Sequence, residues 1–164
     1  MGLQKYESEI KYLNFEQTLV YEKLSDLRNL DNLRQKIADP AAADLLKSNL
    51  PPEIKPEQID KFREYAEKME LGADYIKIAS PMGEVTMRLV EQEAPKCIKF
   101  GTTTSPLPFN LWIQIVPTGE AECKMKLTIG AEVNMFMKAM VNKPLQKAAN
   151  GLADMLARLP YNLF

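Results

Sequence analysis

The 164-residue sequence contains no histidine, only two cysteines and a single tryptophan. The lack of histidine removes the commonest general base, the commonest metal ligand and the usual partner of a serine or cysteine nucleophile. With Cys97 and Cys123 as the only thiols, zinc and iron–sulfur sites have little support, so we expect neither a metal nor a cofactor. Both cysteines lie in strand-like segments, where an inert buried thiol is the expected state and a disulfide between neighbouring strands is the alternative.

The sequence also lacks an excess of charge and any long apolar run. Its formal net charge is −1 and the charges are interspersed, which gives no electrostatic reason to expect binding to nucleic acid or to an anionic membrane. No apolar run approaches the ~18 residues of a membrane span, and the N-terminus has no signal-peptide core. We therefore expect one cytoplasmic domain over residues 1–164, while the oligomeric state stays open.

The strongest pattern that is present covers residues 134–159. Apolar residues recur there at three- and four-residue steps, which predicts one stripe of a helix. This stripe consists of Leu145, Ala148, Leu152, Met155, Leu156 and Leu159. The opposite face, which we expect to meet solvent, consists of Gln146, Lys147, Asn150, Asp154 and Arg158. Because Pro144 follows an apolar group at 135–141, we expect a short helical turn, a cap at Asn142 and a long helix from Pro144.

The chain before this helix divides into a strand, a helical part and a run of strands. Residues 5–12 alternate, which predicts a half-buried strand with Tyr6, Ser8, Ile10 and Tyr12 facing inward. Two short helices follow, to about residue 38, and an inserted helix is expected near 56–71.

From Asp74 the period of the pattern changes to two, and five strands joined by turns such as Pro81-Met82-Gly83 follow. Their short connections predict an antiparallel meander, and each strand has one apolar face. A sheet with one buried side needs a helical layer. We therefore expect an α+β fold, in which a curved six-stranded antiparallel sheet wraps around the long C-terminal helix and leaves an apolar interior.

This order of elements resembles the START-like polyketide cyclase and dehydrase (SRPBCC) superfamily, which has the helix-grip fold. The resemblance covers nearly the whole chain and is carried by KYESEIKYLNFEQTLVYEKLSDLRNL, ASPMGEVTMRLVEQEAPKCIKF, PFNLWIQIVPTGEAECKMKLTIGAEVN and KPLQKAANGLADMLARL. It implies a single helix-grip domain with an apolar cavity between the sheet and the C-terminal helix. Members of the superfamily hold lipids, sterols, quinones, polyketides or hormones there, and a minority catalyse cyclisation or dehydration. The role of the inserted helix stays open.

We predict that the protein binds an apolar small molecule, such as a lipid, a quinone or a polyketide-like compound, without catalysis. The expected cavity wall consists of Ser8, Ile10, Tyr12, Phe100, Leu111, Ile113, Met125, Leu127, Met137, Met140, Val141, Leu145 and Ala148. Methionine is flexible and suits a surface that accepts varied apolar ligands, although ordinary core filling explains the same residues.

Two alternatives belong to other functional classes. A cyclase or dehydratase needs an ionisable or hydroxyl pair inside the cavity, and Ser8 with Tyr12 or Tyr6 is the set that the pattern offers. A protein-interaction module would present an exposed apolar patch around Trp112. Because Trp112 is out of phase with the apolar residues of its strand, we expect it to pack under the inserted helix instead.

Overall fold

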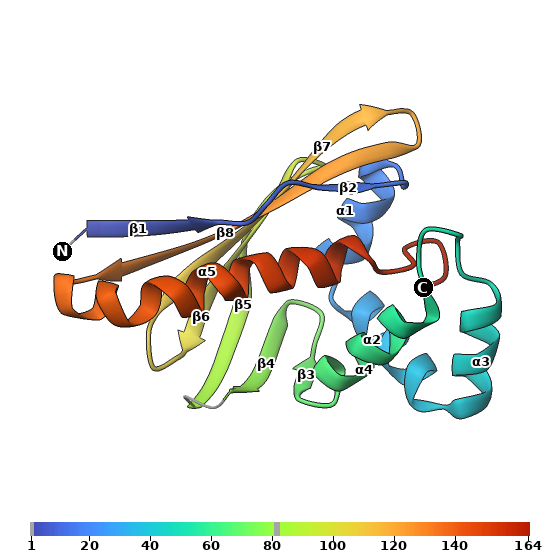
Figure 1. The fold of residues 1–164 in the computed structure, drawn as a ribbon, viewed down its shortest axis with the longest axis horizontal. Coiled ribbons are helices and arrows are strands. Elements are labelled where there is room, and N and C mark those ends of the chain that lie inside the picture. The colour runs from blue at the N-terminus through green and yellow to red at the C-terminus, as the bar shows by residue number, and fades with distance from the viewer. Residues whose placement is uncertain (1, 81–82) are drawn as a thin grey trace.

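The computed structural model describes residues 2–80 and 83–164, which form one antiparallel sheet of eight strands and five helices (Figure 1). The strands are β1 (Gly2–Glu7), β2 (Lys11–Leu13), β3 (Met69–Leu71), β4 (Tyr75–Ser80), β5 (Gly83–Glu93), β6 (Cys97–Thr104), β7 (Phe109–Gly119) and β8 (Glu122–Val133). The helices are α1 (Gln17–Ser25), α2 (Arg28–Ala38), α3 (Pro40–Ser48), α4 (Pro56–Ala66) and α5 (Met135–Ala157). The strand order is β1-β8-β7-β6-β5-β4-β3, and β2 also pairs with β8.

The predicted helix-grip arrangement is confirmed, since the meander curves around the long helix α5 (Figure 1). The number of strands is corrected from six to eight, because residues 69–71 form β3 and the N-terminal strand is divided in two. The inserted helix therefore ends at Ala66 rather than near residue 71. A third helix also precedes it, because Asp39 caps α3 by accepting a hydrogen bond from the Ala41 N–H at 3.1 Å. Pro81 and Met82 of the expected turn lie outside the described residues.

Helix α5 is continuous from Met135 to Ala157, so the predicted break before Pro144 is wrong. The cap is Asn134, whose side-chain oxygen accepts a hydrogen bond from the Met137 N–H at 2.9 Å. Asn142 instead accepts a hydrogen bond from the Tyr6 hydroxyl at 2.7 Å. Pro144 is tolerated because it lies on the exposed side of the helix, where water can satisfy the carbonyl that loses its partner.

The N-terminal strand contains one extra residue relative to its partner β8. Glu7 pairs with Thr128 and Lys11 pairs with Met125, so three residues on one strand oppose two on the other. Such a bulge shifts the alternation of side chains by one position. The single inward face that we predicted for residues 5–12 is therefore wrong beyond Ser8.

The shift decides which side chains reach the interior. Tyr6 is buried before the bulge and Leu13 is buried after it. Ile10 and Tyr12, which were expected inside, are exposed, and the exposed fraction of Tyr12 is 73%. Lys11 takes the position opposite the inward-facing Met125 and reaches an α5 carboxylate instead of solvent.

Both cysteines are free thiols, so the disulfide alternative is wrong. Cys123 lies fully buried on β8, and burial raises the pKa of its thiol from the usual 9.0 to about 11. Cys97 is half-buried at the start of β6, where burial and then the nearby Glu93 and Glu91 carboxylates raise its pKa. Neither thiol is activated as a nucleophile.

We expect the free energy of unfolding to fall when the pH rises above 9. A thiol with a raised pKa in the folded state stabilises the fold below pH 9, and this contribution is lost as the pH approaches 11. A difference of two pKa units corresponds to about 2.7 kcal/mol. Urea denaturation below pH 9 and near pH 11 gives the loss in the free energy of unfolding between the two pH values. This loss should be smaller for Cys123→Ala than for the wild type by about 2.7 kcal/mol. Equal losses in both proteins would contradict this assignment, since Tyr161, whose pKa burial also raises, is common to both.

Candidate functional site

An apolar cavity lies between the inner face of the sheet and the helices that cover it. Its volume is about 60 Å³. The strands β5 to β8 contribute Met87, Phe100, Leu111, Ile113 and Leu127, and α5 contributes Leu152, Met155 and Leu156. Helices α1, α2 and α4 and the strands β3 and β4 supply the remaining wall, and every lining side chain is Leu, Ile, Met or Phe. The cavity therefore offers a ligand apolar contact and no side-chain hydrogen bond.

The strand side of the cavity follows from the register of the sheet. Phe100 pairs with Leu111 across β6 and β7, and Ile113 pairs with Leu127 across β7 and β8. Directly opposed residues in an antiparallel pair point to the same face, so these four side chains form one surface. This part of the wall was predicted from the alternation of each strand and is confirmed as interior.

The remaining predicted wall residues lie elsewhere. Met125 is buried on the same face of β8, and Met137, Val141 and Leu145 are half-buried on α5, but none of these four lines the cavity. Ile10, Tyr12, Met140 and Ala148 are exposed, so their predicted interior placement is wrong. For Ala148 the error is one position, because its neighbour Ala149 is fully buried.

The side of the wall that was not predicted comes from the inserted segment. Phe62 of α4, Met69 of β3, and Ile76 and Ile78 of β4 also line the cavity. The sequence signal for this was the apolar stripe of the inserted helix, of which Ile59 and Phe62 are buried. Because these two side chains of the stripe are buried against the rest of the protein, the inserted helix is part of the domain and not a flap over it.

Ser8 is held by the backbone and does not face the cavity. Its hydroxyl accepts a hydrogen bond from the Leu127 N–H at 2.9 Å and donates one to the Glu9 carbonyl at 2.9 Å. The Ser8 N–H also donates to the Leu127 carbonyl at 2.8 Å. The Ser8 hydroxyl thus takes the place of the backbone acceptor that the bulge removes from the Leu127 N–H.

Ser8→Ala should lower the free energy of unfolding by about 1–3 kcal/mol, because it leaves the buried Leu127 N–H without a partner. Binding of an apolar compound in the cavity should not change. Ser48→Ala is the matched control, since the Ser48 hydroxyl bonds the Leu45 carbonyl at an exposed helix end. Urea denaturation measures both variants, and a Ser8→Ala protein as stable as Ser48→Ala would refute the bulge-filling role.

The hydroxyl set proposed for a cyclase or dehydratase is not brought together. Tyr6 bonds Asn142, Ser8 bonds the backbone and Tyr12 points to solvent. None of the three lines the cavity. The geometry therefore gives this alternative no catalytic pair.

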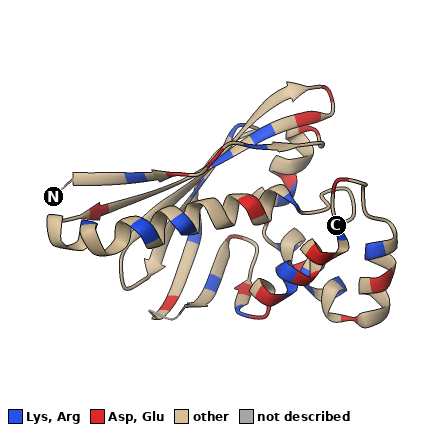
Figure 2. Cartoon of the chain, viewed as in Figure 1, with Lys and Arg blue, Asp and Glu red and all other residues tan. Residues whose placement is uncertain are grey.

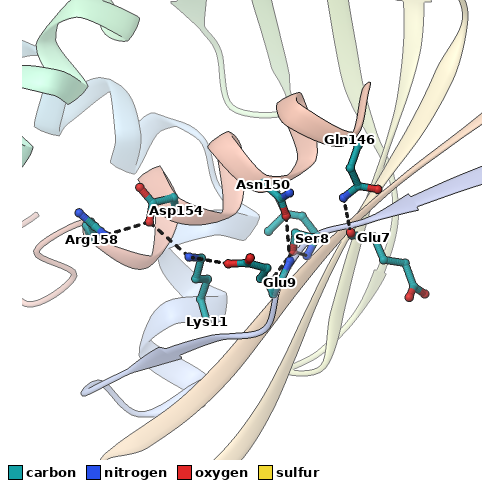
Figure 3. A network of polar contacts seen from close by, with 9 residues as sticks. Glu7, Ser8, Glu9, Lys11, Gln146, Asn150, Asp154 and Arg158 are labelled. Atoms are coloured by element: carbon teal, nitrogen blue, oxygen red, sulfur yellow. Dashed lines mark hydrogen bonds and ion pairs between the residues drawn. The ribbon is translucent and has the colours of Figure 1, made fainter. Parts of the chain in front are cut away.

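One face of α5 is fixed to the N-terminal strand by polar contacts at four-residue steps (Figure 3). They join Gln146 Nε2 to the Glu7 carbonyl at 2.7 Å, the Glu9 N–H to Asn150 Oδ1 at 3.0 Å, and Asp154 to the Lys11 ammonium at 3.4 Å. Arg158 adds an ion pair to Asp154 at 3.1 Å. The prediction that this face meets solvent is wrong for Gln146, Asn150 and Asp154, whereas Lys147 and Arg158 are exposed as predicted. The contacts tie α5 to the β8 side of the sheet.

A surface groove of about 460 Å³ runs outside the cavity between α4 and α5. Met155 lines both the groove and the cavity. Tyr65, Lys68 and Gly151 are among the other groove residues, so its wall is mixed in polarity. The Met155 side chain therefore borders both the apolar interior and the surface groove.

Trp112 lies half-buried on the outer face of the sheet, so its predicted position under the inserted helix is wrong. A Cβ added to Gly130 would come within 2.7 Å of the indole ring, which shows how closely the ring covers that glycine. The Lys99 ammonium lies 5.3 Å from the ring centroid, a cation–π distance. Trp112 therefore does not form the exposed apolar patch expected of an interaction module.

Residues 2–80 and 83–164 contain no group of three or more His, Cys, Asp or Glu side chains placed to hold a metal ion. No helix among them is long and apolar enough to cross a bilayer.

Comparison with known proteins identifies the fold. No protein-family model and no curated protein matches the chain. Norcoclaurine synthase from Thalictrum flavum, solved in complex with dopamine and hydroxybenzaldehyde, superposes with a TM-score of 0.60 at 15% identity, covering 99% of this chain and 89% of that chain. A protein from Thermobifida fusca gives 0.55 at 11% identity, over 99% and 94% of the two chains. The protein XoxI from Bacillus cereus gives 0.53 at 12% identity, over 99% and 98%.

Proposed function

We propose, from the START-like helix-grip fold of this chain, that it binds an apolar small molecule in the cavity beneath α5. The observation that supports this most directly is the lining of the cavity, which contains no polar side chain. Protein interiors are normally packed with few voids, and an apolar void favours hydrocarbon over water. A ligand with a lipid-, quinone- or polyketide-like apolar body fits this lining, with binding energy of roughly 25 cal/mol per Å² of buried area before association costs.

The cavity must enlarge to hold such a ligand. Its volume of about 60 Å³ is well below the ~300–1,000 Å³ of typical ligand pockets. The α5 helix is held to β1 and β2 by the polar contacts of Figure 3, so we assign the movement to the wall formed by α4, β3 and β4. That wall includes Met69, whose side chain has three rotatable bonds and adapts at low cost.

The proposal includes a cytoplasmic location and no catalytic step. Both cysteines are free, as thiols of a reducing compartment usually are. Apolar lining alone gives no acid, base or nucleophile for a reaction. The ligand is therefore held, not converted.

The decisive experiment compares two isoleucine-to-phenylalanine variants of β7. Ile113 lines the cavity, whereas Ile115, two residues along the same face, is equally buried but does not. Titration with the neutral fluorophore N-phenyl-1-naphthylamine should show saturable binding to the wild type. We expect at least tenfold weaker binding for Ile113→Phe, whose larger ring occupies the cavity, and unchanged binding for Ile115→Phe.

Circular dichroism first establishes that both variants are folded, because overpacking costs about 1–3 kcal/mol. Native mass spectrometry of the freshly purified wild type independently detects any apolar compound that copurifies with it. Absence of saturable fluorophore binding together with an empty protein would refute the proposal. Equal binding to both variants would place the fluorophore outside the cavity and would also refute it.

A further inference from the structure

The first turns of α5 expose large apolar side chains at one end of the molecule. The exposed fractions are 87% for Met135, 87% for Phe136 and 76% for Met140. Single exposed apolar residues are ordinary, but three within six positions of one helix form a patch. In Figure 1 this end of α5 lies beside the start of β1 and projects away from the helices α1 to α4. A broad, flat partner can therefore reach it.

The same part of α5 carries charge of one sign. Lys138, Lys143 and Lys147 are all exposed, and residues 135–153 contain no Asp or Glu. The first carboxylate of the helix is Asp154, which is paired with Lys11 and Arg158. Figure 2 shows the corresponding blue bands along the first half of α5.

Carboxylates on neighbouring elements do not cancel this charge. Glu132, at the end of β8, is exposed close to the helix start, and Glu7 on β1 is paired with Lys126 at 3.3 Å. Among the described residues in this part of the molecule, the exposed carboxylate of Glu132 is thus outnumbered by the three lysines of α5. The net charge of −1, from which we expected no anionic partner, averages over the whole chain and hides this local excess.

The apolar and basic side chains are arranged in order along one exposed stripe. Phe136, Met140, Lys143 and Lys147 follow at steps of four, three and four residues, which places them on the same helical face. At 1.5 Å per residue, the two lysines lie roughly 10–16 Å behind Phe136. An amphipathic helix buries its apolar part about 5–10 Å deep at the acyl boundary of a bilayer. The lysine stems can then extend to the lipid phosphates.

We propose that this surface, formed by Phe136, Met140, Lys143 and Lys147 with Met135 beside them, binds the surface of an anionic lipid bilayer. The apolar residues alone fit several partners, but the uniform positive charge next to them is complementary to acidic lipid headgroups. The contact is peripheral and requires no spanning helix. It is independent of the cavity, so it stands whether or not the interior holds a ligand.

Vesicle cosedimentation tests the proposal with the full chain. The wild type should sediment with vesicles of phosphatidylcholine mixed with phosphatidylserine, and not with pure phosphatidylcholine, and added salt should release it. Lys143→Glu with Lys147→Glu should weaken binding by at least roughly twentyfold, since each lysine near an anionic leaflet contributes about fivefold. Met135→Ser, Phe136→Ser and Met140→Ser together should weaken it by at least tenfold. Lys55→Glu with Lys96→Glu makes the same charge change at exposed sites outside α5 and should leave binding unchanged.

All of the substituted side chains are exposed, so folding is not at risk, and circular dichroism verifies it. Failure of the wild type to bind mixed vesicles at low salt would overturn the proposal. Equal binding by the α5 charge variant and its control would do the same. A concentration-dependent dimer in size-exclusion chromatography that the apolar triple variant abolishes would assign the surface to a second copy of the chain and would overturn it as well.

Discussion

Phe100→Ala is expected to lower the free energy of unfolding by about 3–5 kcal/mol and to create a site for a small aromatic hydrocarbon. Phe100 is only 2% exposed, lies on β6 between Leu89 and Leu111, and lines the cavity. Removing its ring joins the vacated space to the existing void of about 60 Å³. Apolar cavities of about 150 Å³ stay dry and bind benzene. Benzene should therefore raise the melting temperature of the variant more than that of the wild type.

Phe136→Ala provides the matched control, because the same substitution is made at a side chain that is 87% exposed. We expect a change in stability within about 0.5 kcal/mol and a response to benzene no larger than that of the wild type. Thermal unfolding followed by circular dichroism, with and without benzene, measures all four combinations. If the Phe100→Ala protein were destabilised but did not respond to benzene, the surrounding side chains would have collapsed into the space, and the cavity would not be a site that can expand.

The long strands were predictable because each repeats the two-residue alternation of apolar and polar side chains several times. Over residues 74–133 the apolar residues alternate along segments of six to twelve residues, and short turns leave only antiparallel neighbours as partners. The four cavity residues Phe100, Leu111, Ile113 and Leu127 follow from that alternation alone. The strand β3 was missed because three residues are too few to show a period, and β2 was predicted only as the end of one undivided N-terminal strand.

The bulge in the N-terminal strand could not be read from its own sequence. Residues 5–12 alternate without interruption, and the extra residue becomes visible only when the strand is paired with β8. Pairing is a tertiary property, since it depends on which partner residues lie opposite. Tyr12 was therefore assigned to the interior although Lys11 and Leu13 occupy that face.

The side of the site formed by α4, β3 and β4 was predicted less well, for a related reason. Phe62, Met69, Ile76 and Ile78 come from a segment whose relation to the cavity depends on where α4 packs. The apolar stripe of α4 shows that it covers something but does not identify what it covers. For Gln146 and Asn150 of α5 the sequence predicted exposure to solvent. Both side chains instead form hydrogen bonds with backbone groups of the N-terminal strand.

Ala149→Leu is expected to lower the free energy of unfolding by about 1–3 kcal/mol, whereas Ala148→Leu should change it by less than about 0.5 kcal/mol. Ala149 and Ala153 are fully buried one turn apart on α5, so small side chains allow the helix to lie close to the sheet. Leucine at 149 forces the helix outward, but its helix propensity is nearly that of alanine, so the effect reports packing alone. Ala148 is exposed, although the sequence pattern places it on the buried stripe.

Urea denaturation of the two variants therefore measures the rotation of α5 about its axis. The reverse result, a costly change at 148 and a neutral one at 149, would mean that the helix is turned by roughly 100° from the orientation described above. Leu152 and Met155 would then turn away from the cavity, and the polar contacts of Asn150 and Asp154 with the N-terminal strand would be lost. The expected order of the two variants thus tests the rotation of α5 about its axis. Both the α5 side of the cavity and the exposed stripe of Phe136, Met140, Lys143 and Lys147 depend on that rotation.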